Sequence, residues 1–117
     1  MLSGQVKKGD ASWQIDSVLQ TESLWERTRG LLGREALRAN QALWIIPCNS
    51  IHSVGMVYAL DLVYLNKHSR VIKLVQELKP LRASFALRAH SVLELRAGEI
   101  SRLNINEGDM LRWLPNE

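Results

Sequence analysis

Short apolar runs separated by turn residues are the feature that most restricts what this chain can fold into. The clearest pair is Leu60–Leu65 and Val71–Val75, which are joined by the polar segment 66–70. Two β-rich runs with a short polar loop between them predict an antiparallel hairpin. The continuous run Ala42–Ile46, which ends at Pro47, is typical of a strand that is buried on both faces.

Further strands are predicted by weaker patterns along the chain. Alternating apolar residues indicate a strand over 12–20, and residues 50–57 are expected to be extended. Residues 84–89 fit either a strand or a loop. The remaining runs predict strands over 91–95 and 110–114.

Two short helices complete the expected elements. Ser23 and Glu26 match a capping box, in which the serine hydroxyl accepts from the third amide and the glutamate returns to the cap amide. Gly33 suits the end of this first helix. A second helix is expected over 97–103. The predicted fold class is therefore α+β, a compact β-rich sheet or partly closed barrel of about six or seven strands with two short helices.

Length and charge narrow the class of protein. The chain has 117 residues, and we expect a flexible leader over 1–11 and a single globular domain over 12–117. No apolar run is long enough to span a bilayer, and no apolar segment follows the basic N-terminal residues, so we expect a cytoplasmic protein without a membrane span. The net charge of +3 comes from arginines that are interspersed with acids. This pattern favours a solvated surface over a nucleic-acid footprint.

The segment Pro47–Asp61 concentrates the residues that can carry chemistry. It contains the only cysteine, Cys48, together with His52 and Asp61. One hypothesis is a hydrolase or thiol-dependent enzyme in which Cys48 is the nucleophile, His52 the base and Asp61 the residue that orients it. In an extended chain, however, positions four apart lie roughly 13 Å from each other. This distance favours a buried structural cysteine and leaves His52 and Asp61 as the better candidates.

A binding site is the preferred hypothesis for the same segment. Ser50, His52 and Asp61 predict a small polar pocket that receives a peptide or small ligand. The other ligand-binding residues predicted for it are Met56, Trp44 and Arg34. Asp61 lies in an apolar strand and must be exposed, paired or hydrogen-bonded; Arg34 is its expected partner, and a turn cap is the alternative. We expect no bound metal and no cofactor, because paired ligand spacings are lacking.

The remaining charged residues of note are Glu94 and a set of four arginines. Glu94, between Leu93 and Leu95, is expected to face solvent on a strand that is buried on one side. A third functional alternative is weak nucleic-acid or anion binding, and it requires four arginines on one face. These are Arg27, Arg34, Arg82 and Arg88.

Several separated motifs occur in an order that resembles one known family. They are Arg29–Arg34, Leu43–His52, Gly55-Met56, Leu60–Leu65, Val92–Gly98, Leu103–Ile105 and Gly108-Asp109. The chain is similar over about residues 13–114 to the bacterial and archaeal family known as domain of unknown function 192. It resembles the branch with a proline–cysteine pair before the serine–histidine element. Ala59 stands where members usually have proline.

The resemblance implies a small β-dominated α+β domain and no established reaction. Members of the family often carry an N-terminal export signal or anchor, and some occur among secretion or pilus genes. Together with the residue patterns, this favours a non-catalytic binding or accessory domain with a possible link to secretion or pilus systems.

Overall fold

The computed structural model describes residues 1–10, 12–31 and 35–116, and within them nine strands and two helices form an α+β fold. The predicted fold class is confirmed. The elements in chain order are β1 Leu2–Lys8, β2 Gln14–Gln20, α1 Leu24–Arg29, β3 Gln41–Ile45, β4 Ser50–His52, β5 Leu60–Leu65, β6 Val71–Leu78, β7 Ala83–Phe85, β8 Ser91–Arg96, α2 Glu99–Leu103 and β9 Leu111–Pro115.

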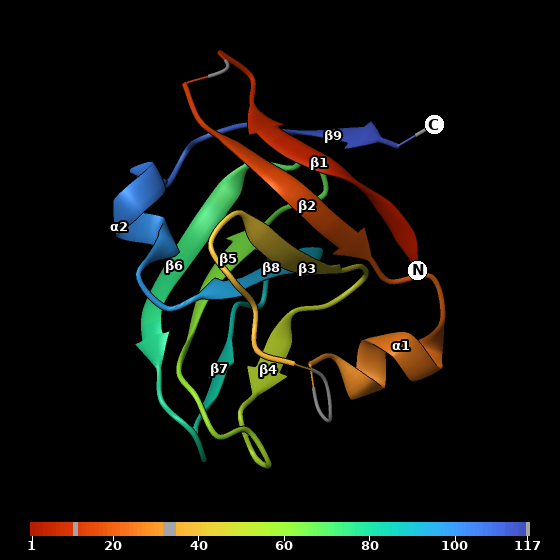
Figure 1. Cartoon of the computed structure of the whole chain (residues 1–117), viewed down its shortest axis with the longest axis vertical. Coiled ribbons are helices and arrows are strands. Elements are labelled where there is room, and N and C mark those ends of the chain that lie inside the picture. The colour runs from red at the N-terminus through yellow and green to blue at the C-terminus, as the bar shows by residue number, and fades with distance from the viewer. Residues whose placement is uncertain (11, 32–34, 117) are drawn as a thin grey trace.

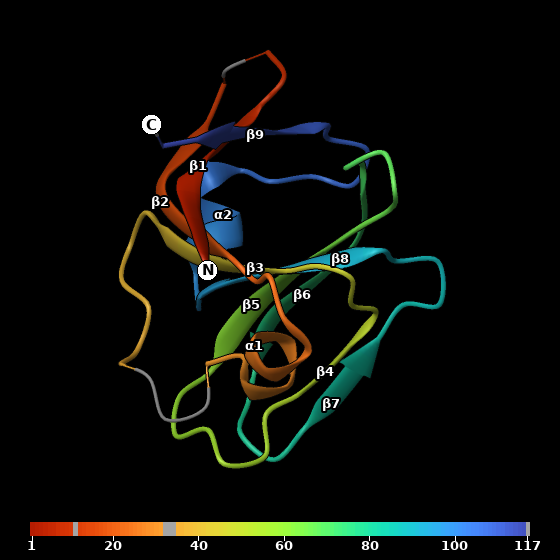
Figure 2. The same ribbon diagram turned by 90° about the vertical axis from the view of Figure 1, so that its right-hand side faces the viewer.

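Seven strands form one curled sheet, and two short strands form another. The order in the large sheet is β6-β5-β8-β3-β2-β1-β9, and the small sheet pairs β4 with β7. Within the large sheet β2 and β3 are parallel, and the other neighbouring strands are antiparallel. A bridge between Arg70 and Met110 joins the starts of the two edge strands, so the sheet curls into a half-barrel (Figures 1 and 2).

The first strand corrects the expectation of a flexible leader over 1–11. β1 lies between β2 and β9, and its residue Val6 is fully buried. Burial alternates along β1 at Gly4 and Val6, but only Val6 carries an apolar side chain, so the sequence shows no strand pattern there. Gly4 is required at this position, because a Cβ atom there would lie 2.5 Å from the carbonyl oxygen of Leu114 on β9.

The predicted hairpin is confirmed as β5 and β6, which pair from Leu60 to Leu65. The cap of α1 is confirmed as well, since the Ser23 hydroxyl accepts from the Glu26 amide at 3.1 Å. The Glu26 carboxylate accepts from the amide of Glu22 at 2.7 Å, one residue before the cap amide that the capping box predicts. The expected helix end at Gly33 lies outside the described residues.

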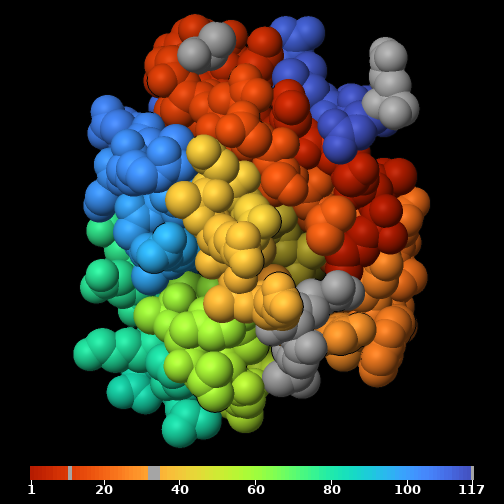
Figure 3. Space-filling view, in the orientation of Figure 1, coloured from red at the N-terminus to blue at the C-terminus, as the bar shows by residue number. Residues whose placement is uncertain are grey.

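The large sheet buries side chains on both faces, which creates two apolar cores. One core fills the half-barrel and includes Val63, Leu93 and Leu95. The other lies on the outer face, beneath α1 and the small sheet, and includes Leu43, Leu62 and Val92. The central strands β5 and β8 contribute to both cores, so a side chain on either face of them is enclosed by protein. The space-filling view shows the connection between β4 and β5, in yellow-green, at the end of the molecule opposite the β1–β2 turn (Figure 3).

Candidate functional site

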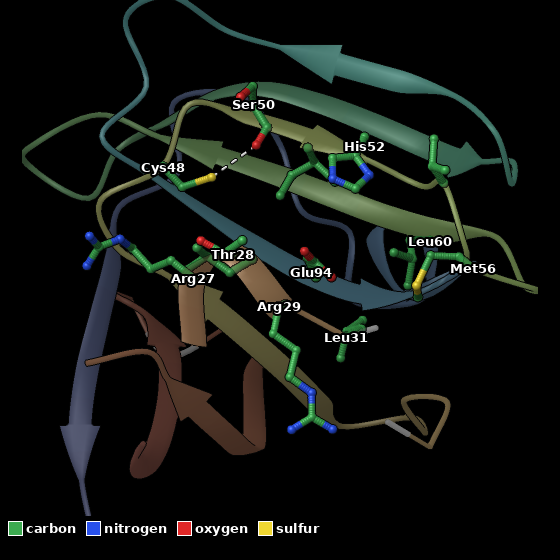
Figure 4. Close-up of a pocket in the computed structure, with 14 residues that line it drawn as sticks. Arg27, Thr28, Arg29, Leu31, Cys48, Ser50, His52, Met56, Leu60 and Glu94 are labelled. Carbon is green, nitrogen blue, oxygen red and sulfur yellow. Dashed lines mark hydrogen bonds between the residues drawn. The ribbon is translucent and has the colours of Figure 1, made fainter. Parts of the chain in front are cut away.

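A cavity of about 210 Å³ lies on the outer face of the large sheet, where α1 and β4 approach it. Its apolar walls come from strands of the large sheet, from the end of α1 and from the segment around β4. Its polar lining comes from α1, β4 and β8. Figure 4 shows these side chains around the opening. The lining residues used below are Arg27, Thr28, Gly30, Leu31, Ile45, Cys48, Ser50, His52, Met56, Leu60 and Glu94.

Ser50 and His52 both line this cavity. They lie at the two ends of β4, whose three residues pair with Ala83–Phe85. Both residues are exposed, and neither side chain makes a hydrogen bond with any residue in the described ranges. Their hydroxyl and imidazole groups are therefore accessible to a molecule that enters the opening.

Cys48 also reaches the cavity, but its environment disfavours a nucleophilic thiolate. Its thiol donates a hydrogen bond to the carbonyl oxygen of Ser50 at 3.1 Å. Burial raises the pKa of the Cys48 thiol above its ordinary value, whereas an activated cysteine requires a lowered pKa. Within the described part of the chain, no hydrogen bond joins this thiol to His52. The hypothesis of a thiol-dependent enzyme at this site stays a prediction without a geometric argument in its favour.

Met56 completes the predicted residues that meet at the cavity, while Trp44 lies elsewhere. Met56 lines the opening from the segment after β4. Trp44 packs in the core of the half-barrel, where its ring meets that of Trp113 edge-on at 5.9 Å between centroids. Its placement corrects the prediction that it lines the same pocket as Met56. Arg34, the remaining predicted ligand-binding residue, lies outside the described residues.

Asp61 is fully buried on the other face of the sheet, so the predicted pairing with His52 in one pocket is wrong. Backbone amides satisfy its carboxylate: Glu77 donates at 2.9 Å, Gly98 at 3.0 Å and Ile100 at 2.9 Å. These three hydrogen bonds hold β6 and the start of α2 against β5. Asp61 therefore acts as a cap for backbone amides, which is the predicted alternative to an ion pair.

Glu94 is the residue of the cavity that the sequence interpretation missed. It lies on β8 between the apolar partners Leu43 on β3 and Leu62 on β5, and it is 4% exposed. The expectation that it faces solvent is wrong, because α1 and β4 cover this face of the sheet. Burial raises the pKa of the Glu94 carboxyl from 4.5 to about 7. Figure 4 shows this carboxyl group among the lining side chains, between Thr28 and His52.

The end of α1 forms the wall beside Glu94. Gly30 ends the helix with φ 52° and ψ −125°, a conformation that side-chain-bearing residues rarely adopt. A Cβ atom built on Gly30 would lie 3.6 Å from the Glu94 Oε1 atom, so the backbone passes close to the carboxyl group. Arg27 is half-buried at the rim and has no ion pair with an acidic residue in the described ranges. The cavity thus combines a buried acid with a basic rim.

Metal ions and nucleic acid are two further classes of ligand to compare with the described residues. Among the described residues, no group of three or more His, Cys, Asp and Glu side chains is placed to hold a metal ion. Arg82 and Arg88 are exposed on either side of β7, and Arg27 lies on α1. Their joint role in binding nucleic acid stays a prediction.

A comparison with protein-family models gives a match for this chain. The family model DUF192, described as Uncharacterized ACR, matches residues 5–113. This chain belongs to the DUF192 family. The family predicted from the sequence motifs is therefore confirmed, and the match includes most of β1 as well as the segment that forms the cavity. No curated protein matches the chain.

Two solved structures share the fold of this DUF192 protein. A protein of unknown function from Novosphingobium aromaticivorans DSM 12444 has a TM-score of 0.76 at 21% identity, with 95% of this chain and 84% of that chain covered. A protein proposed to be a transcription regulator from Sinorhizobium meliloti 1021 has a TM-score of 0.82 at 17% identity, with 95% and 93% covered. At these identities the likeness extends to the fold alone. In the described part of the chain no helix is long and apolar enough to cross a membrane.

Proposed function

We propose that this DUF192 protein is a small, non-catalytic binding domain whose ligand enters the cavity between α1 and β4. The observation that carries the proposal is the buried carboxyl group of Glu94 at this cavity, beneath a rim formed by Ser50 and His52. A folded domain usually buries a carboxyl group only with compensation. A ligand that bonds to this group supplies such compensation.

Several properties of the cavity support binding. Its volume of about 210 Å³ suits a small molecule or one side chain of a peptide. Its walls include Ile45, Leu60 and Met56, which offer apolar contact, while its polar groups are few and located at the rim and beside β8. This combination of apolar walls with a few polar groups is typical of ligand sites.

The chemistry of the polar groups favours binding over catalysis. A nucleophilic mechanism needs a thiolate beside a base, and the Cys48 thiol is half-buried with a raised pKa and is bonded to a carbonyl oxygen. Asp61, the residue expected to orient His52, lies on the opposite face of the sheet. A link to secretion or pilus systems is a further part of the proposal, and it rests on the family resemblance.

The proposal is tested by screening small molecules of varied charge against the ¹⁵N-labelled protein by NMR. We expect at least one class to shift the amide signals of Gly30, Ser50 and His52 together. Ser50→Leu, which narrows the exposed opening, is expected to weaken this binding about tenfold or more. Ser101→Leu is the matched control, because Ser101 is exposed on α2. If no compound shifts these amides, or if Ser50→Leu binds as tightly as the control, the proposed site is wrong.

A further inference from the structure

The cavity has opposite electrical character at its two ends. The deep polar group is the carboxyl of Glu94, which neighbouring strands surround with Leu43 and Leu62. Arg27 and His52 line the rim, and the Arg27 side chain extends outward, away from Glu94 (Figure 4). Apolar side chains, among them Leu31, Leu60 and Met56, line the same cavity beside Glu94 (Figure 4). A ligand that matches the cavity therefore needs a hydrogen-bond donor at one end, an apolar middle and an acceptor at the other end.

We infer that the ligand carries a primary ammonium group that binds the Glu94 carboxylate, an apolar stem, and an anionic group that meets Arg27. This inference rests on the proposed function of the cavity and names the chemical class of its ligand.

The ammonium end follows from the position of Glu94. A carboxylate among apolar residues gains most from a donor that also carries positive charge, because charge-assisted hydrogen bonds are stronger in a protected site. A Cβ atom built on Gly30 would lie 3.6 Å from the Glu94 Oε1 atom, so the space between this backbone and the carboxyl group accepts only a small group. A narrow primary ammonium fits such a confined site better than a planar, wider guanidinium group.

The apolar middle follows from the walls. Ile45 and Leu60 are almost completely buried, and Leu31 and Met56 add further apolar surface. An alkyl stem that enters here removes its own surface and that of the walls from water, at about 25 cal/mol per Å² of apolar area. The cavity of about 210 Å³ is large enough for a chain of several methylene groups with its two end groups.

The anionic end follows from the charge at the rim. Arg27 is half-buried and forms no ion pair with an acidic residue of the described ranges, and His52 lies across the opening. A ligand with only a positive group meets like charge at the entrance, whereas a carboxylate at its outer end is attracted there. A contact at an exposed rim contributes less than one at the buried end, because water and salt screen it.

Three probes of similar length separate these contributions: 5-aminopentanoate, pentylamine and pentanoate. Isothermal titration calorimetry at pH 8 and low salt is expected to rank 5-aminopentanoate first, pentylamine second and pentanoate last. Glu94→Gln keeps the shape of the side chain and removes its charge, so it is expected to weaken 5-aminopentanoate at least tenfold and to leave pentanoate unchanged or bound more tightly.

Arg27→Gln tests the rim. We expect it to weaken 5-aminopentanoate about threefold and to leave pentylamine unchanged or bound slightly more tightly, because the like charge at the entrance is removed. Arg88→Gln is the matched control, because Arg88 is an exposed arginine that does not line the cavity, and it is expected to have no effect on either probe.

The outcomes distinguish this inference from the proposed function. Neutral or anionic compounds that shift the cavity amides while pentylamine and 5-aminopentanoate do not bind would overturn the ammonium ligand and leave the binding domain standing. A cavity that binds no compound of any charge overturns both. Equal affinity for pentylamine and 5-aminopentanoate overturns the role of Arg27 as the anion-binding group, and an unchanged ranking in Glu94→Gln overturns the role of Glu94.

Discussion

The two faces of the large sheet each bury one carboxyl group, and they treat it in opposite ways. On the inner face Asp61 accepts from the backbone amides of Glu77, Gly98 and Ile100. On the outer face Glu94 lines a cavity, and burial raises the pKa of its carboxyl to about 7. The two residues lie on adjacent strands, since Asp61 pairs with Leu95 and Glu94 pairs with Leu62.

Burial alone therefore does not indicate whether a carboxyl group stabilises the fold or binds a ligand. The amides around Asp61 belong to three separate segments of the chain, so the hydrogen bonds to its carboxylate stabilise the fold. Glu94 is surrounded by apolar side chains and lines an open cavity. Its charge therefore lowers the stability of the fold, and its carboxyl group is available to a ligand. The comparison predicts opposite effects of neutralising the two residues.

The largest effect is expected for Asp61→Asn. The substitution replaces an oxygen that accepts hydrogen bonds with an NH₂ group that faces backbone donors. Hydrogen bonds to a charged group contribute about 1.5–3 kcal/mol each, so we expect a loss of about 4 kcal/mol in the free energy of unfolding. Urea unfolding of the wild type and the variant measures this difference in the free energy of unfolding. A loss below about 1 kcal/mol would contradict the stabilising role of this carboxylate.

Glu94→Gln is expected to act in the opposite direction and to depend on pH. Below pH 4.5 the carboxyl is protonated in both the folded and the unfolded protein, so its burial as a charge costs nothing. Between pH 4.5 and about 7 the unfolded chain releases the proton first, so stability falls as pH rises. Above about pH 7 the full cost of roughly 3 kcal/mol remains.

The measurement is urea unfolding of the wild type and Glu94→Gln at pH 4.5, 6 and 8. We expect the variant to be more stable by up to about 3 kcal/mol at pH 8 and equal to the wild type at pH 4.5. A variant that is less stable at pH 8 would show that the Glu94 carboxylate is a structural group like that of Asp61, which would remove the contrast between the two faces.

Gly30→Ala tests the wall of the cavity next to Glu94. The added Cβ atom finds space at 3.6 Å from Oε1, but the backbone at φ 52° and ψ −125° disfavours a side chain. We expect a loss of about 2 kcal/mol from this strain, seen in thermal unfolding. Gly9→Ala is the control, because Gly9 has no such conformation and its nearest neighbour would lie 3.9 Å away; it should change stability little.

The smallest effect is expected for Ser23→Ala, which removes the cap of α1. The lost hydrogen bond to the Glu26 amide should cost about 1 kcal/mol. Ser23→Asp retains an acceptor and is expected to keep wild-type stability, as thermal unfolding of both variants will show. Because α1 forms one wall of the cavity, Ser23→Ala should also broaden the amide signals of the residues that line it; sharp, unshifted signals would show that the cavity does not depend on the cap.

Much of the candidate site was visible in the sequence because it is contiguous. Cys48, Ser50, His52 and Met56 lie within nine residues, and all four line the cavity. Trp44 lies on the other face, because along β3 it alternates with Leu43 and Ile45, whose side chains belong to the outer core. Asp61 differs for another reason: its partners at Gly98 and Ile100 are more than thirty residues away, and no local pattern indicates them.

The sequence by itself determined the family, the hairpin of β5 and β6, the cap of α1 and the segment that carries the cavity's polar groups. These depend on periodicity and turn chemistry within a few residues. Only the tertiary structure decided that β1 is a strand, that Asp61 is a structural group and that Glu94 is buried at the cavity. Each of these depends on which distant element covers a face of the sheet, and alternation along one strand carries no information about that cover.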